Sequence, residues 1–175
     1  MPQKNYPQVL IAGVGNVLRQ DDGFGVEVAR QLQKRADLPD CVKVVETGIG
    51  GISLVQELYD GYETLLLVDV VSNEGNPGQI FMLEAKVGDI ADWPIQEKRD
   101  FLADMHYTDP NRALMLAKAL DVLPRSVYIV GCQPLECGDF KLGLSEEIQN
   151  AVPRAVEHIM AWISAFYQSQ QSLES

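Results

Sequence analysis

The chain has 175 residues, enough for about one domain, and 46% of them are hydrophobic, so it can bury a core without disulfides or a structural metal. It has 14 Lys and Arg against 25 Asp and Glu, a formal charge of −11 that argues against nucleic acid and anionic membranes as main partners. Its first residues show no secretory signal pattern, and no apolar run approaches the roughly 20 residues of a membrane span. We therefore expect a single cytoplasmic domain over residues 1–175.

Apolar blocks alternate with helical patterns along the chain, bounded by Gly, Pro and Asn. The predicted elements, in chain order, are a strand at 8–14, a helix at 25–32, a strand at 42–47, a helix at 52–59, strands at 64–71 and 79–84, an extended connection at 85–104, a helix at 110–120, a strand at 126–131 and a helix at 145–166. This order predicts a three-layer α/β/α sandwich around a twisted, mostly parallel sheet of about five strands.

Several local features refine these elements. The strand at 79–84 should pair antiparallel at an edge, since only a turn separates it from the strand before it. Asp109 followed by Pro110 is typical of an N-cap and first helical position. Pro153 should kink or split the last helix, and the polar tail 168–175 should be frayed.

A Gly-rich turn, GVGNVLRQDDGFG, follows the first strand at 13–25. A GxG after a strand is compatible with dinucleotide binding, but Leu18 stands where a third glycine is needed, and two acids would repel phosphate at the helix start. We expect one of Asp21 and Asp22 to cap the helix and the other to face a cleft.

Asp69 and His106 are the other candidate site residues. An ionised carboxylate in the most apolar strand is costly unless it is paired, bound to a metal or caps a nearby loop. His106 precedes a predicted helix, whereas His158, the other histidine, is expected to be exposed on the last helix. Asp22, Asp69 and His106 can reach the same edge of a parallel sheet, where they would suit Zn²⁺ or Ni²⁺ with open coordination positions.

The three cysteines form no pattern of a zinc site or a disulfide framework, because their number is odd and no CxxC occurs. We expect Cys41, Cys132 and Cys137 to be buried or half-buried thiols. No serine lies in a GxSxG motif, so the sequence offers no other credible nucleophile.

Three segments resemble the hydrogenase maturation endopeptidases: GVGNVLRQDDGFG at 13–25, LLLVDVV at 65–71 and VGCQPLECGDFKLGLSEEIQNAVPRAVEHI at 130–159. The resemblance extends from Val9 to Ile163. It implies an enzyme that removes a short C-terminal extension from the large-subunit precursor of a nickel–iron hydrogenase. Cleavage would follow nickel insertion, and the nickel in the substrate would be the recognition element.

The resemblance also implies roles for individual residues. It assigns metal contacts to Asp22, Asp69 and His106, with nickel contributed by the substrate and zinc or cadmium as substitutes in vitro. Glu46 opens the second Gly-rich loop, ETGIGG, and would orient a water or a ligand. This loop departs from the family's usual Asp-Gly-Gly-Thr-x-Gly, and the segment after His106 also differs. The hydrogenase class that is processed and the participation of Asp109 are therefore left open.

Two other hypotheses fit the same residues. The protein could be a non-catalytic module that checks nickel loading or chaperones the large subunit, or a nucleotide-dependent α/β enzyme. We expect a monomer that binds its precursor transiently, through a surface whose acidity favours a basic partner.

Overall fold

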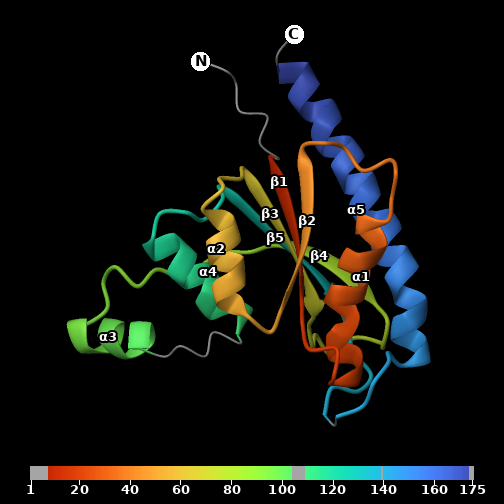
Figure 1. The fold of residues 1–175 in the computed structure, drawn as a ribbon, viewed down its shortest axis with the longest axis horizontal. Helices are drawn as coiled ribbons and strands as arrows, with labels where there is room; N and C mark the ends of the chain where they lie inside the picture. The colour runs from red at the N-terminus through yellow and green to blue at the C-terminus, as the bar shows by residue number, and fades with distance from the viewer. Residues whose placement is uncertain (1–7, 104–108, 139, 174–175) are drawn as a thin grey trace.

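The computed structural model describes residues 8–103, 109–138 and 140–173 (Figure 1). Its elements, in chain order, are β1 (Val9–Val14), the 3-10 helix η1 (Gln20–Gly23), α1 (Phe24–Gln33), β2 (Val42–Gly48), α2 (Gly51–Leu58), β3 (Thr64–Val70), β4 (Ile80–Glu84), α3 (Ile95–Ala103), α4 (Pro110–Ala119), β5 (Ser126–Cys132) and α5 (Glu146–Leu173). All five predicted strands and all four predicted helices are present.

The five strands form one sheet in the order β2-β1-β3-β5-β4. β1, β2, β3 and β5 run parallel, and β4 lies antiparallel at the edge, as predicted. Its partner is β5, however, and not the preceding β3. The reason is that β5 pairs along the whole of β3, from Thr64 opposite Ser126 to Val70 opposite Cys132, and so occupies that edge.

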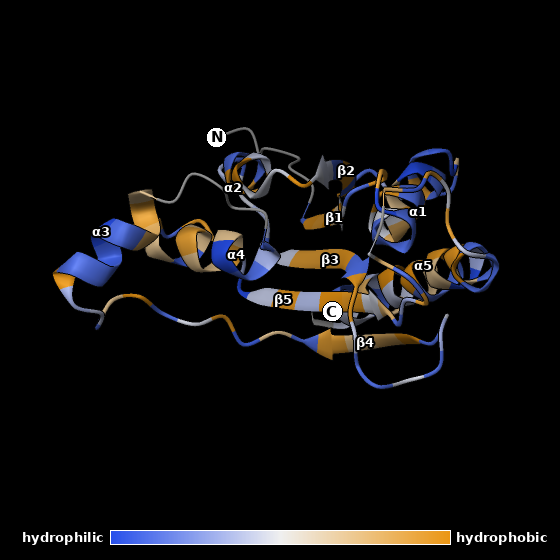
Figure 2. Cartoon of the chain, turned by 90° about the horizontal axis from the view of Figure 1, so that it is seen from below, coloured by the Kyte–Doolittle hydropathy of each residue, from blue (hydrophilic) through white to orange (hydrophobic). Residues whose placement is uncertain are grey.

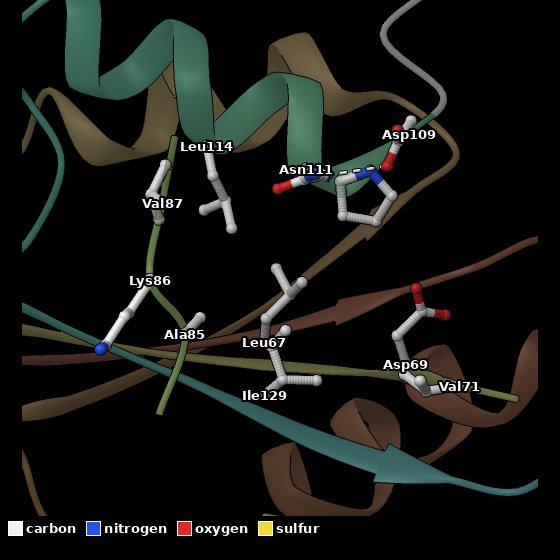
Figure 3. Close-up of a pocket in the computed structure, with 11 residues that line it drawn as sticks. Leu67, Asp69, Val71, Ala85, Lys86, Val87, Asp109, Asn111, Leu114 and Ile129 are labelled. Carbon is white, nitrogen blue, oxygen red and sulfur yellow. Dashed lines mark hydrogen bonds between the residues drawn. The ribbon is translucent and has the colours of Figure 1, made fainter. Parts of the chain in front are cut away.

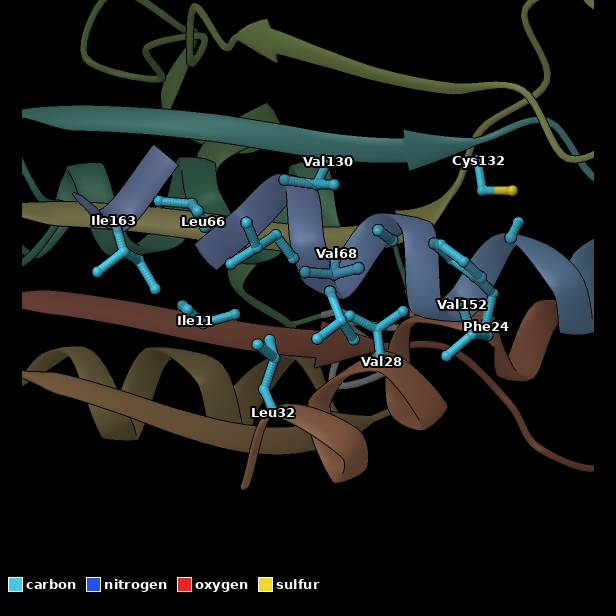
Figure 4. Packing of buried hydrophobic residues seen from close by; sticks show 14 of the residues in the cluster. Ile11, Phe24, Val28, Leu32, Leu66, Val68, Val130, Cys132, Val152 and Ile163 are labelled. Carbon is cyan, nitrogen blue, oxygen red and sulfur yellow. The ribbon is translucent and has the colours of Figure 1, made fainter. Parts of the chain in front are cut away.

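Helices cover both faces of the sheet, which confirms the predicted three-layer sandwich (Figures 1 and 2). Alternate residues of β1 face opposite layers. Val9 and Ile11 join the core under α1 and α5, and Figure 4 shows Ile11 there, whereas Leu10 and Ala12 join the core under α2 and α4. None of the helices in the described part of the chain is long and apolar enough to span a membrane.

The segment expected to be an extended connection contains a helix, α3, so that prediction was wrong over Ile95–Ala103. Phe101 is the buried residue of α3, and its ring packs edge-on against Trp93 with ring centroids 5.7 Å apart. The Arg112 guanidinium lies 5.0 Å from the centre of the same ring. A helix with one buried side chain has no repeating apolar stripe, and that stripe is the signal by which sequence periodicity identifies a helix.

The last helix is longer and more continuous than expected. It is not split at Pro153. The proline has no N–H to donate to the carbonyl of Gln149, but both residues are exposed, so that carbonyl can bond to water instead. It also continues through Leu173, where a frayed tail was expected, and Phe166 near that end stacks on Trp162 with ring centroids 5.1 Å apart. His158 is exposed, as predicted.

Candidate functional site

The carboxyl ends of the parallel strands bring together three acidic side chains from different segments. Asp22 lies in η1, which follows β1, and Asp69 is the penultimate residue of β3. Asp109 lies at the start of α4. The sheet therefore gathers at one edge residues that are 40 or more positions apart in the sequence.

In the turn after β1, Gly15 allows the backbone of Asp22 to come close to Asp69. This glycine has φ +133°, a conformation that residues with side chains rarely adopt. A Cβ at Gly15 would lie 1.8 Å from the backbone oxygen of Asp22 and 3.9 Å from Asp69 Oδ1. Gly13 is equally confined, because a Cβ there would lie 2.2 Å from the backbone oxygen of Gly25 in α1. Close packing of the chain against itself thus accounts for both glycines of the GxG without a bound phosphate.

Asp21 is fully buried and holds together two loops that are distant in sequence. Its Oδ2 atom accepts hydrogen bonds from the backbone N–H of Leu135 at 3.0 Å and of Glu136 at 2.9 Å. Ser145 donates twice, from its N–H to Oδ1 at 2.7 Å and from its hydroxyl to Oδ2 at 2.9 Å. Asp21 therefore anchors the connection between β5 and α5 to the turn that carries Asp22.

The prediction that one of the two acids caps the first helix was wrong. The N-cap residue of α1 is Gly23, and no side chain makes a cap hydrogen bond there. Asp21 is turned inward to the β5–α5 connection instead, because four donors converge on it. Asp22 is half-buried, and among the described residues its carboxylate accepts a hydrogen bond from Asn16 N–H at 3.0 Å. That it faces a cleft stays a prediction.

Asp69 has an environment that favours a protonated carboxyl group. Its Oδ1 atom accepts a hydrogen bond from the N–H of Val70 at 2.8 Å. Burial raises the pKa of Asp69 to about 7, and the negative charges of Asp22 and Asp109 act in the same direction. Both effects favour the protonated carboxyl group, whereas a nearby cation would favour its ionised form.

Asp109 caps α4 and also faces the site. Its Oδ1 atom accepts a hydrogen bond from Asn111 N–H at 2.9 Å, so the predicted N-cap is confirmed. Asp109 and Asp69 line the same cavity, and its charge contributes to the raised pKa of Asp69 (Figure 3). The carboxylate thus serves the helix and the electrostatics of the site together.

Glu46 is held apart from these acids. Its Oε2 atom lies 3.1 Å from Nε of Arg30 in an ion pair on the exposed side of β2. Together with Gly15 and Asn16 it lines a cavity of about 250 Å³ that does not include Asp69. The structure therefore brings Glu46 to the same sheet edge as Asp22 but into a neighbouring cavity.

The predicted third metal ligand, His106, lies outside the described residues. Within the described part of the chain, no three His, Cys, Asp or Glu side chains are grouped so that they could hold a metal ion. Asp22 and Asp69 are the members of the predicted set that the structure brings together.

The cysteines are buried or half-buried, as predicted: Cys132 is buried, and Cys41 and Cys137 are half-buried. Burial, together with the charges of Asp22 and Asp21, raises the pKa of the Cys137 thiol to about 11, so the thiol is a poor nucleophile. Sequence reasoning did not single out Cys137 as a neighbour of the acids. It lies in an irregular loop, where no periodic pattern could have placed it.

Comparisons with known proteins agree with this architecture. The family model for hydrogenase maturation proteases matches residues 26–162. A protein of Methanocaldococcus jannaschii that is named as a hydrogenase maturation protease is 35% identical over 158 residues, which cover 89% of this chain and 96% of that protein. The delta subunit of coenzyme F420 hydrogenase from Methanothermobacter thermautotrophicus is 29% identical over 160 residues, which cover 87% of this chain and 92% of that subunit.

Solved structures show the same fold. The hydrogenase 2 maturation peptidase from a Thaumarchaeota archaeon has a TM-score of 0.65 at 33% identity, covering 89% of this chain and 97% of that one. The hydrogenase maturating endopeptidase HybD from E. coli has a TM-score of 0.70 at 23% identity, covering 90% of this chain and 93% of that one. The chain described here belongs to the hydrogenase maturation protease family and is a peptidase.

Proposed function

We propose that this peptidase removes the C-terminal extension from the large-subunit precursor of a nickel–iron hydrogenase after nickel has been inserted. The observation that carries the proposal is that Asp22 and Asp69 both lie beside Gly15, at the carboxyl ends of the parallel strands, close enough for the charge of Asp22 to act on Asp69. In a chain of this family, two carboxylates at one sheet edge suit contact with a metal ion that the precursor brings.

We assign the metal contacts to Asp22, Asp69 and His106. His106 precedes Asp109 by three residues, a length of chain that spans at most about 11 Å. The charge of Asp109 in turn acts on Asp69. Two carboxylates and an imidazole suit a borderline ion such as nickel, and they leave coordination positions for the precursor's own ligands. Zinc or cadmium would fit the same donors in vitro.

The raised pKa of Asp69 supports recognition of a loaded precursor over an empty one. A proton on Asp69 relieves repulsion from Asp22 and Asp109 when no cation is present. A precursor that carries nickel replaces that proton with a divalent charge, whereas an empty precursor does not. A divalent ion held there polarises the scissile carbonyl or lowers the pKa of a bound water.

Glu46 has a less direct part in this proposal. Arg30 engages its Oε2 atom, which leaves Oε1 to orient a water or a ligand. Membership of a protease family favours the endopeptidase over a non-catalytic module that only checks nickel loading. A cytoplasmic location and a monomeric state stay predictions.

The intact mass of a nickel-loaded precursor, measured before and after incubation with the purified full-length protein, tests the proposal. We expect release of a C-terminal peptide from the loaded precursor and not from the nickel-free one. Asp22→Asn, Asp69→Asn and His106→Ala should each slow release by ~10²-fold or more, because substitution of even the outer partners of metal ligands weakens metal sites by about 10–100-fold.

Asp40→Asn is a matched control, because Asp40 is an exposed acid just before β2, at the amino ends of the parallel strands and away from Asp22 and Asp69. It should process the precursor at the wild-type rate. Wild-type processing by Asp22→Asn, or equal cleavage of loaded and empty precursors, would contradict the proposed role of the metal.

A further inference from the structure

A cavity of about 350 Å³ opens beside Asp69, between the sheet and α4 (Figure 3). Its volume lies at the lower end of the range of about 300–1,000 Å³ for ligand-binding pockets. Most of its walls are apolar and come from four segments: Leu67 and Val71 at β3, Ile129 in β5, Leu114 in α4, and Ala85 and Val87 after β4. Such walls accept an aliphatic side chain and disfavour a charged one, which would lose its hydration without gaining a partner.

The two ends of this cavity carry opposite charge. Figure 3 shows Asp69 and Asp109 at one end and Lys86 at the other. Among the described residues that line the cavity, Lys86 is the one cation, and none of the ion pairs of the described chain engages it. An exposed, unpaired ammonium group in a chain with a net charge of −11 is available to bind an anionic group of a ligand.

The sheet fixes the length of the cavity. Asp69 lies opposite Gly131 on β5, and Ala85 N–H donates a hydrogen bond to the carbonyl of Val127, four residues earlier on the same strand. At about 3.3 Å per strand residue, the segment that carries Lys86 lies about 13 Å from Asp69 along the strand direction. β4 also lies two strands from β3, about 9.6 Å to the side, so the direct separation is about 16 Å, which an extended peptide covers in about five residues.

We propose that this cavity is a specificity subsite for the precursor's C-terminal extension. It takes an aliphatic side chain next to the scissile bond, and Lys86 binds a carboxylate about five residues further along the extension. The inference rests on the proposed function, because it takes Asp69 to mark the position of the scissile bond. It adds a sequence preference that the metal contacts alone would not impose.

Steady-state cleavage of the nickel-loaded precursor by full-length variants tests the subsite. Ala85→Phe fills the cavity from an irregular segment, and Lys86→Glu reverses the charge at its far end. Lys34→Glu is the matched control, because Lys34 is an exposed lysine at the end of α1, which covers the other face of the sheet. We expect Ala85→Phe to raise KM by about tenfold or more, and Lys86→Glu to raise it by about three- to tenfold. Both variants should keep the wild-type kcat, and the control should keep both constants.

Exchanging the charges of Lys86 and its partner in the extension gives a change in KM that a purely structural role of Lys86 would not produce. Substituting each acidic residue of the extension by lysine should reveal one position, about five residues from the scissile bond, that restores the KM of Lys86→Glu to within twofold of wild type. The subsite is refuted if both variants keep KM within twofold, or if no exchange restores it.

Failure of the proposed function would give a different result. If the wild-type protein cleaves neither precursor, the dissociation constant of the nickel-loaded precursor tests the subsite separately. Ala85→Phe and Lys86→Glu should then weaken binding by the same factors, with Lys34→Glu unchanged. Equal binding by all of these proteins would overturn the subsite as well.

Discussion

Asp21 and Asp22 are adjacent and chemically identical, yet their surroundings predict opposite effects of the same substitution. Asp21 is fully buried and accepts four hydrogen bonds, two of them from Ser145. Asp22 is half-buried and, among the described residues, accepts one, from Asn16. Asparagine keeps the shape of aspartate but removes its charge and turns one acceptor atom into a donor.

The structure gives the magnitude for each substitution. In Asp21→Asn, the new amide N–H₂ would face donors at one of the two former oxygen positions, and the remaining bonds would lose their ionic character. A hydrogen bond to a charged group contributes about 1.5–3 kcal/mol, and bonds within one network are not additive. We expect Asp21→Asn to lower the free energy of unfolding by about 3–5 kcal/mol. Asp22→Asn should change it by less than about 1 kcal/mol, because the lost bond is offset by weaker repulsion of Asp69.

Urea unfolding at pH 7, followed by circular dichroism, measures both values for the wild-type protein and the two variants. The m-value should be unchanged, so that a shift of the midpoint reports stability alone. The assignment of Asp21 as the anchor of the β5–α5 connection would be refuted by a loss below about 1 kcal/mol in Asp21→Asn. Equal losses in the two variants would also refute it.

Three further predictions use the same unfolding assay. The pKa of Asp69, about 7, lies above the ordinary 3.8, so the folded state binds the extra proton between these values. Stability should therefore fall as pH rises from about 4 to about 7, and Asp69→Asn should flatten that slope. Pro153→Ala should raise stability by about 1–3 kcal/mol, because it restores a helical donor on an exposed face; an unchanged midpoint would contradict this. Gly25→Ala should cost more than about 4 kcal/mol, since its Cβ would lie 2.1 Å from the backbone oxygen of Val68; a folded variant of near wild-type stability would refute that packing.

The fold was predictable wherever a repeating pattern of apolar residues indicates which positions are buried. β3 was the clearest case, because a strand covered on both faces has apolar residues throughout. The partner of β4 was not predictable in the same way, since its register depends on which strand arrives at the free edge of β3. α3 escaped prediction because Phe101 is the one buried residue among those described in it, so it has no apolar stripe.

The site was predictable to the extent that strand ends determine it. Asp22 and Asp69 each follow or end a parallel strand, and the topology alone brings them to one edge. The anchoring role of Asp21 was missed because its partners Leu135 and Ser145 lie 114 and 124 residues away in sequence. Lys86 was missed because it lies on an irregular segment, where position follows from tertiary contacts and not from periodicity.

The electrostatics of this edge follow from where the cations of the chain are held. Arg30 is paired with Glu46, and Lys86 lies about 13 Å along the strands from Asp69. The charges of Asp22 and Asp109 are therefore accommodated by a proton on Asp69, which burial already favours. A proton held in this way is easily exchanged for a divalent ion, because metal binding to carboxylates releases protons. Under the proposed function, this exchange is available to a precursor that carries nickel and not to an empty one, so nickel loading decides whether the precursor docks.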